Sequence, residues 1–242
     1  MRLVISVFTL LLLAGLTVNA LDVPASTGYV SDYAGMLSAS EAQRLDQKLR
    51  QYDQQTTNQV VILIVKSLEG EAIESFGIRV AEKWKPGQKG KDNGVIITIA
   101  EQEHKTRIDV GYGLEGDLTD LESALILDRI IKPKFRTGKY YDGINEAVDT
   151  IIKAISGELK VADYAESVNR REKGKDSLSY FFILIFAIFI IISIFSRFRR
   201  GIGGPGIFLG GFGGGSRGGG GFSGGFSGGG GGFGGGGASG RW

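Results

Sequence analysis

Two long apolar segments, one at the N-terminus and one towards the C-terminus, most constrain how this 242-residue chain can fold. The first has Arg2, an apolar run over residues 3–16 and small residues up to Ala20, a pattern typical of a secretory signal peptide. A signal anchor that stays in the membrane is the alternative. Because the small Ala20 is followed by the polar Asp22, cleavage is favoured, and residues 1–20 are predicted to be a signal peptide.

The second apolar segment covers residues 178–196 and carries no charged side chain. About 18 helical residues at roughly 1.5 Å each extend about 27 Å, enough to cross a bilayer core. A buried helix of a soluble domain is the alternative. Arg197, Arg199 and Arg200 follow at once, and such a cluster favours a cytoplasmic end. Together with the signal peptide, this segment predicts a single membrane span with the preceding residues outside and the following residues inside.

The parts on either side of the predicted span differ in composition. Residues 158–177 are polar and charged and are predicted to be a linker. Residues 197–242 are mostly glycine with spaced aromatic side chains and end in Trp242. A chain so rich in glycine loses much entropy on ordering and has few side chains to bury, so we expect a disordered cytoplasmic tail. Self-association through the aromatic residues is the alternative.

Residues 21–157 are the part of the chain in which helix and strand patterns alternate. The continuous apolar runs over 60–65 and 94–100 indicate strands buried on both faces. Residues 105–112 alternate apolar and polar side chains, which indicates a second strand of a hairpin near a sheet edge.

Four helices are predicted in the same region. The first follows a capping box from Ser38 to Glu41, and the third is kinked or shortened by Pro133. The other predicted helices cover residues 72–84, 122–136 and 142–155. Helices that alternate with buried strands predict an α/β fold, a three-layer α/β sandwich around a mixed sheet.

Composition excludes several classes of chemistry. The chain has no cysteine and one histidine, which removes thiol chemistry and the usual zinc or iron sites. The formal net charge is +2, and the basic clusters flank the predicted span, so no nucleic-acid surface is expected. The glycines around Lys89 and Lys91 lack the spacing of a phosphate-binding loop.

Carboxylate and amide side chains, which offer oxygen ligands, are the remaining candidates for a metal site. They occur at the ends of predicted elements. Such loop carboxylates suit a hard divalent cation, Ca²⁺, Mg²⁺ or Mn²⁺. The candidate ligands are Asp32, Asp92, Asn93, Glu115 and Asp120. Ordinary caps and turns are the alternative for each: Asp120 follows Thr119 in a capping box, and Asp92 and Asn93 precede a glycine, as in many turns.

The chain resembles the TPM domain family over about residues 28–157. The resemblance rests on four segments in order, which read VSDYAGML from residue 30, GKDNGV from 90, VGYGLEG from 110 and PKFR from 133. Bacterial members similarly carry a signal peptide, a single span and a glycine-rich end. The resemblance therefore implies the bacterial inner membrane, with the TPM domain on the periplasmic side.

The resemblance also implies properties of the fold and the site. It implies a Rossmann-like α/β/α sandwich with an acidic depression that binds divalent cations, acid phosphatase activity in some members and photosystem repair in plant ones. Carried onto this chain, the acidic positions are Asp32, Asp92, Glu115 and Asp120, with Asn93 beside them. Two departures leave the substrate geometry open: residues 85–88 lack the usual glycine-rich variant, and Thr119 replaces the usual proline.

Two functions follow as hypotheses. The favoured one is a membrane-anchored, extracytoplasmic, divalent-cation-binding module that supports assembly or maintenance of membrane complexes through membrane-protein partners. The alternative is a metal-dependent acid phosphatase that acts on phosphomonoesters, with Asp92 as base or nucleophile and Lys91 or Arg129 as a phosphate clamp. No oligomeric state is predicted.

Overall fold

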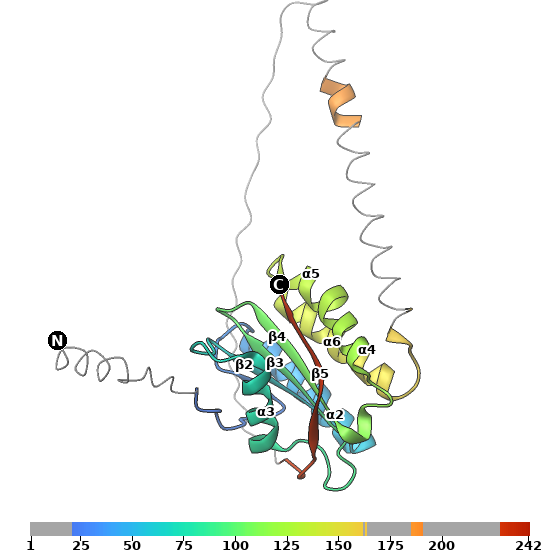
Figure 1. The fold of residues 1–242 in the computed structure, drawn as a ribbon. Helices are drawn as coiled ribbons and strands as arrows, with labels where there is room; N and C mark the ends of the chain where they lie inside the picture. The colour runs from blue at the N-terminus through green and yellow to red at the C-terminus, as the bar shows by residue number, and fades with distance from the viewer. Residues whose placement is uncertain (1–20, 162, 164–184, 191–227) are drawn as a thin grey trace, which may run out of the picture.

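The computed structural model describes residues 21–161, 163, 185–190 and 228–242 (Figure 1). The predicted signal peptide lies outside these residues, as does most of the predicted span. Within the described parts of the chain, we find no helix that is long and apolar enough to cross a membrane.

A mixed sheet forms the middle layer, as predicted, and it has five strands, of which β1 and β5 were not predicted. Its strands follow the order β1-β2-β3-β4-β5, of which the first three are parallel and the last two antiparallel to their neighbours. Every residue of β2 and β3 is buried, as their continuous apolar sequences predicted. The bounds are Val30–Asp32, Gln59–Val65, Gly94–Ala100, Lys105–Gly111 and Phe233–Arg241.

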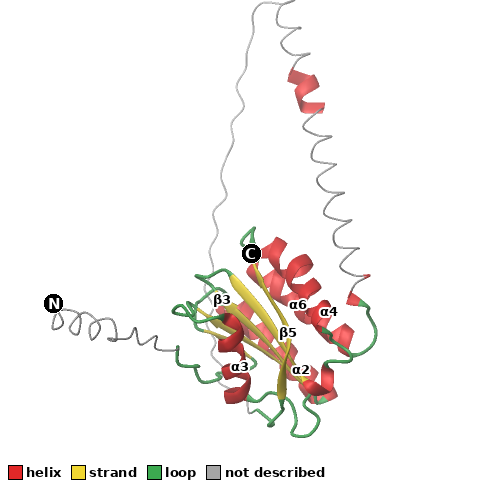
Figure 2. Cartoon of the chain, viewed as in Figure 1, coloured by secondary structure: helices red, strands yellow, loops and turns green. Residues whose placement is uncertain are grey.

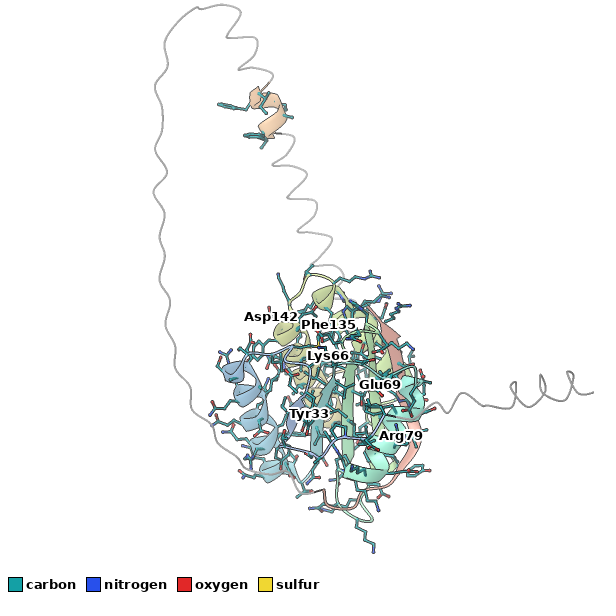
Figure 3. The ribbon with its side chains drawn as sticks, turned by 90° about the vertical axis from the view of Figure 1, so that its left-hand side faces the viewer. Tyr33, Lys66, Glu69, Arg79, Phe135 and Asp142 are labelled. Atoms are coloured by element: carbon teal, nitrogen blue, oxygen red, sulfur yellow. The ribbon has the colours of Figure 1, made fainter. Side chains whose placement is uncertain are left out.

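Helices cover both faces of the sheet (Figures 2 and 3). The helix α2 begins after the predicted capping box, in which the side chain of Ser38 accepts from the backbone N–H of Glu41 and that of Glu41 accepts from Ser38. The helices α2 and α3 lie on opposite faces. The helical elements of the domain are α2 (Ala39–Thr56), α3 (Ile73–Trp84), η1 (Tyr112–Leu114), α4 (Asp120–Ile126), η2 (Leu127–Ile131), α5 (Lys132–Phe135) and α6 (Tyr140–Ile155).

The predicted third helix is present but interrupted. A π-helical turn, η2, joins α4 to α5, and Pro133 lies in the first turn of α5. Proline lacks an N–H and clashes with the carbonyl one turn earlier, so a widened turn at this point relieves the conflict. Val161 is fully buried in the core, which extends the packed domain past the predicted boundary at residue 157.

The prediction of a disordered tail is wrong for residues 228–242. The strand β5 pairs antiparallel with β4, from Lys105 opposite Arg241 to Gly111 opposite Phe233. The prediction weighed only side-chain burial against the entropy of glycine. It omitted the backbone N–H and C=O groups along β4, which an added strand can pair.

The position of β5 also constrains the membrane topology. A strand that pairs with β4 of its own chain lies on the same side of any membrane as β4. An outside domain and an inside tail are therefore incompatible with this pairing in one chain that crosses the bilayer once between residues 178 and 196.

Candidate functional site

The five predicted ligands do not converge, because Asp32 lies at the opposite end of the sheet from Asp92 and Asn93. Asp32 ends β1 and pairs with Ile64, whereas Asn93 precedes β3 and its carbonyl accepts from the N–H of Gln59 at 3.0 Å. Since β1, β2 and β3 are parallel, about six strand residues, or roughly 20 Å, separate the two positions. The Asp32 carboxylate instead accepts from the N–H groups of three residues that lead into α2: Ala34, Gly35 and Leu37, at 3.1, 2.8 and 2.8 Å.

Asn93 has a structural role in the turn before β3. Its side chain is buried, and Nδ2 donates to the Thr57 carbonyl at 2.8 Å and to Asn58 Oδ1 at 2.9 Å. Its Oδ1 accepts from the Gln88 N–H at 2.8 Å. Both amide protons and the amide oxygen are therefore used within the fold.

The other three predicted ligands all lie against the C-terminal strand. Asp92 Oδ1 accepts from the Gly232 N–H at 2.7 Å, and Asp120 Oδ1 accepts from the Gly237 N–H at 2.6 Å. Glu115 lies so close to Gly236 that a methyl group there would come 2.6 Å from Oε1. The acidic edge, as we call Asp92, Glu115 and Asp120, thus contacts a segment of the same chain.

The acidic edge is extended rather than clustered. Its carboxylates bind Gly232 and Gly237, which are separated by roughly 16 Å of extended strand. Only Glu115 and Asp120 contact neighbouring positions of β5. Among the described residues, no group of three or more His, Cys, Asp or Glu side chains is placed to hold a metal ion.

An aromatic socket, formed by Phe135 and His104, holds the C-terminal residue. The Trp242 ring lies edge-on to Phe135, with centroids 4.8 Å apart, and 5.3 Å from the His104 ring. The backbone N–H of Trp242 donates to the His104 carbonyl at 3.1 Å, and Ser239 Oγ donates to Glu74 Oε1 at 2.5 Å. The sequence around Trp242 contains no pattern that predicted this contact.

A buried ion pair on β4 was not predicted from the sequence. Arg107 Nε donates to Asp109 Oδ1 at 2.6 Å, and both side chains are almost completely buried beneath α3. Burial raises the pKa of Asp109 to about 6, although the adjacent Arg107 acts in the opposite direction. Because β4 alternates polar and apolar residues, its polar face was expected near an exposed edge, whereas β5 and α3 cover it.

The fold and the site together define a class: a small mixed-sheet α/β/α domain whose carboxylates and aromatic side chains follow one edge of the sheet. Residues 30–154 match the family model described as the TPM domain, which is named for a phosphatase. The chain therefore belongs to the TPM domain family, as its sequence motifs predicted.

Three solved structures of bacterial proteins are similar to this chain. The N-terminal domain of a P. gingivalis protein is 30% identical, with a TM-score of 0.48, and the match covers 55% of this chain and 85% of that one. The N-terminal domain of the cg2496 protein from Corynebacterium glutamicum is 15% identical, with a TM-score of 0.41 and coverages of 60% and 88%. The BA42 protein from Bizionia argentinensis is 16% identical, with a TM-score of 0.44 and coverages of 53% and 87%. Comparison with curated proteins finds no match.

Proposed function

We propose that this TPM-domain protein is a membrane-anchored interaction module that supports the assembly or maintenance of membrane complexes. Its binding surface is the strand-accepting edge, defined as β4 with the acidic edge and the aromatic socket. One observation carries the proposal: β5 occupies this edge and is held there by backbone pairing, by carboxylates and by Trp242. Addition of an extended segment to a sheet edge is a common mode of peptide recognition.

The strand-accepting edge selects glycine at Gly234 and Gly237, where it leaves no room for a side chain. A methyl group on Gly237 would lie 1.9 Å from the Ile108 carbonyl oxygen, and one on Gly234 would lie 2.2 Å from the Tyr112 ring. Both distances are far below van der Waals contact. The edge therefore suits a glycine-rich strand that ends in an aromatic residue.

A pair of engineered cysteines tests whether β5 docks in the full-length protein. Lys105 and Arg241 are register partners, and the chain has no cysteine of its own. We expect Lys105→Cys with Arg241→Cys to form an intramolecular disulfide on mild oxidation, seen as a faster-migrating monomer without reductant. The matched control, Lys105→Cys with Phe233→Cys, separates the thiols by about 20 Å along the strands and should not cross-link.

Each cross-linking outcome decides one point. A disulfide-linked dimer would show that the strand comes from a second copy. Failure of the Lys105–Arg241 pair to react in either form would overturn the strand-binding proposal. An intramolecular disulfide formed in the native membrane would also place the C-terminus and the domain on one side.

A divalent cation remains part of the proposal at Glu115 and Asp120. These are the two members of the acidic edge that contact neighbouring residues of β5. Two carboxylates completed by water suit Mg²⁺, which keeps several waters when bound. A cation there would draw the Asp120 carboxylate away from the Gly237 N–H, so cation and strand would compete.

Phosphatase activity is the second candidate, favoured by the name of the family model. Asp92 would be the nucleophile or base, and it is partly exposed with a left-handed φ of 50°. Lys91, beside it, would provide the positive charge, whereas Arg129 is paired with Asp128 at 3.3 Å.

The phosphatase candidate predicts a large effect of one substitution. Asparagine tolerates the left-handed conformation, so Asp92→Asn should keep the fold. We expect it to lower the rate of aryl phosphate hydrolysis by the full-length protein with Mg²⁺ at least 100-fold, since it removes the reacting group. Asp117→Asn, at an exposed carboxylate between η1 and α4, is the control. An unchanged rate in Asp92→Asn would exclude Asp92 from the reaction.

A further inference from the structure

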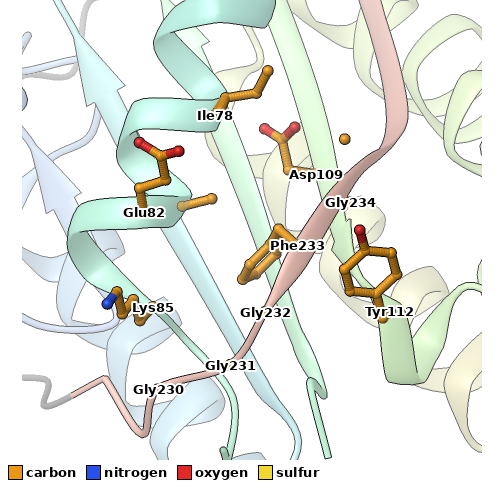
Figure 4. A pocket seen from close by; sticks show the side chains of 12 residues that line it. Ile78, Glu82, Lys85, Asp109, Tyr112, Gly230, Gly231, Gly232, Phe233 and Gly234 are labelled. Atoms are coloured by element: carbon orange, nitrogen blue, oxygen red, sulfur yellow. The ribbon is translucent and has the colours of Figure 1, made fainter. Parts of the chain in front are cut away.

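A cavity of about 510 Å³ lies between α3, β4 and the C-terminal strand (Figure 4). The helix α3 forms one wall, and residues 230–235 form the wall opposite. Asp109 of β4 lies between the two walls. A volume of this size matches the cavities in which proteins bind small molecules.

The Asp109 carboxylate lacks a hydrogen-bond donor on one side. Its side chain is 2% exposed, and while Oδ1 accepts from Arg107, Oδ2 has no hydrogen-bond partner among the described residues. Leaving a buried polar group unpaired costs about 1–3 kcal/mol, and more for a charged one. A ligand that brings an N–H group to Oδ2 would remove this cost.

The space around Asp109 depends on a glycine in α3. A methyl group on Gly77 would lie 2.5 Å from Asp109 Oδ2 and 3.0 Å from Arg107 Cδ. Glycine is an unfavourable residue inside a helix, so its presence here is explained by the ion pair below it.

The remaining lining favours a cation with an apolar body. Phe233 and Tyr112 provide aromatic surface on the side of the C-terminal strand, and Ile78 provides aliphatic surface from α3 (Figure 4). Glu82 and Lys85 complete the charged lining, and Arg107 balances the charge of Asp109 while occupying only its Oδ1. Aromatic rings beside a carboxylate attract ammonium and guanidinium groups and disfavour anions.

We propose that this cavity binds a small organic cation whose ammonium or guanidinium group donates to Asp109 Oδ2 and whose apolar part packs between Phe233 and α3. Because β5 and the glycines before it form one wall, the site rests on the strand docking proposed above. The C-terminal strand thereby acts as both a ligand of the sheet edge and a wall of a second binding site.

Titration of the purified full-length protein with benzylamine, which is cationic at neutral pH, tests the proposal. We expect benzylamine to bind in the millimolar range, and neutral benzyl alcohol and anionic benzoate at least tenfold more weakly, by calorimetry or NMR. Asp109→Asn should weaken benzylamine at least tenfold, while Glu82→Gln, which removes the other lining carboxylate, should weaken it less than threefold. Equal binding of the alcohol, or unchanged binding in Asp109→Asn, would overturn the proposal.

Two further proteins keep the outcome interpretable. If Asp109→Asn does not fold, Phe233→Ala changes the same cavity from the strand side and should weaken benzylamine at least threefold; unchanged binding in it would overturn the proposal. The disulfide-linked Lys105→Cys/Arg241→Cys protein holds β5 in place. If that protein does not bind benzylamine, the cavity proposal fails while strand docking stands, whereas failure to form the disulfide contradicts strand docking itself.

Discussion

Replacing Gly237 by alanine is expected to release the C-terminal strand from the sheet. The new methyl group would lie 1.9 Å from the Ile108 carbonyl oxygen, and Gly237 has a φ of 128°, which L side chains rarely adopt. Neither conflict is relieved by a side-chain rotation, because both involve the backbone. We expect amide exchange in residues 238–241 to accelerate at least 100-fold, about 2.7 kcal/mol, as measured by mass spectrometry.

Gly240→Ala is the matched control for this prediction. A methyl group on Gly240 would contact only Leu127, at 3.5 Å and 3.7 Å, which is ordinary van der Waals contact. Alanine also restricts the unfolded chain more than glycine does, which favours the docked strand. Exchange should change less than threefold in this variant. If the two variants exchange at the same rate, the strand-accepting edge does not select glycine in the way proposed.

The second large effect concerns the pH dependence of stability and depends on Asp109. Burial raises its pKa from 3.8 to about 6 in the folded protein. The folded state therefore holds this proton more tightly than the unfolded state does. The resulting stabilisation is fully present below pH 3.8 and is lost as the pH rises to about 6. A shift of this size corresponds to about 3 kcal/mol.

Asp109→Asn should remove this component of the pH dependence. The other charged groups around Asp109 are Arg107 on its own strand and Glu74, Glu82 and Lys85 on α3. Because asparagine also leaves Arg107 without its ion-pair partner, the variant loses stability at every pH. Only the difference in stability between two pH values therefore tests the prediction. Denaturant unfolding at pH 4 and pH 7 gives the difference in free energy of unfolding, which should shift by about 2 kcal/mol in favour of pH 7 relative to the wild type, because pH 4 still lies just above the unfolded pKa of 3.8.

Asp128→Asn provides a control of opposite sign. A hydrogen bond from Lys132 is the largest cause that lowers the pKa of Asp128, so its contribution is present at neutral pH and lost as the pH falls. Asp128→Asn removes this contribution, so it should lower the free energy of unfolding at pH 7 relative to that at pH 4. If Asp109→Asn leaves the difference between pH 4 and pH 7 unchanged, the Asp109 carboxyl does not change protonation in this range in the folded state.

Local patterns in the sequence predicted the main part of the domain. The apolar runs of β2 and β3 predicted buried strands because both faces of these strands are covered by helices. The capping box at Ser38 and Glu41 predicted the start of α2 because its hydrogen bonds join residues that are close in the chain. The four TPM segments identified the family for a similar reason, since each is a short run of neighbouring residues.

The candidate site was predicted less well, because its geometry depends on contacts between distant residues. Asp32, Asp92 and Asp120 lie at or beside the ends of elements, as expected, but whether they converge depends on the direction of the parallel strands, which places Asp32 at the far end of the sheet. The Gly232–Asp92 hydrogen bond joins residues separated by 140 positions. The backbone N–H of Gly232 donates to the Asp92 carboxylate, and a glycine-rich sequence carries no side-chain pattern that would reveal this contact.

By itself, the sequence determined the α/β class, the helices and three of the five strands of the domain, the family and the residue types available for chemistry. Those properties depend on hydrophobic periodicity, capping and short motifs, all of which act over a few residues. Only the tertiary structure decided that β5 joins the sheet, that Asp92 and Asp120 bind its amides and that Asp109 is buried beside a cavity. These features follow from backbone pairing and burial between segments far apart in the chain, where the same glycine-rich residues would otherwise favour disorder.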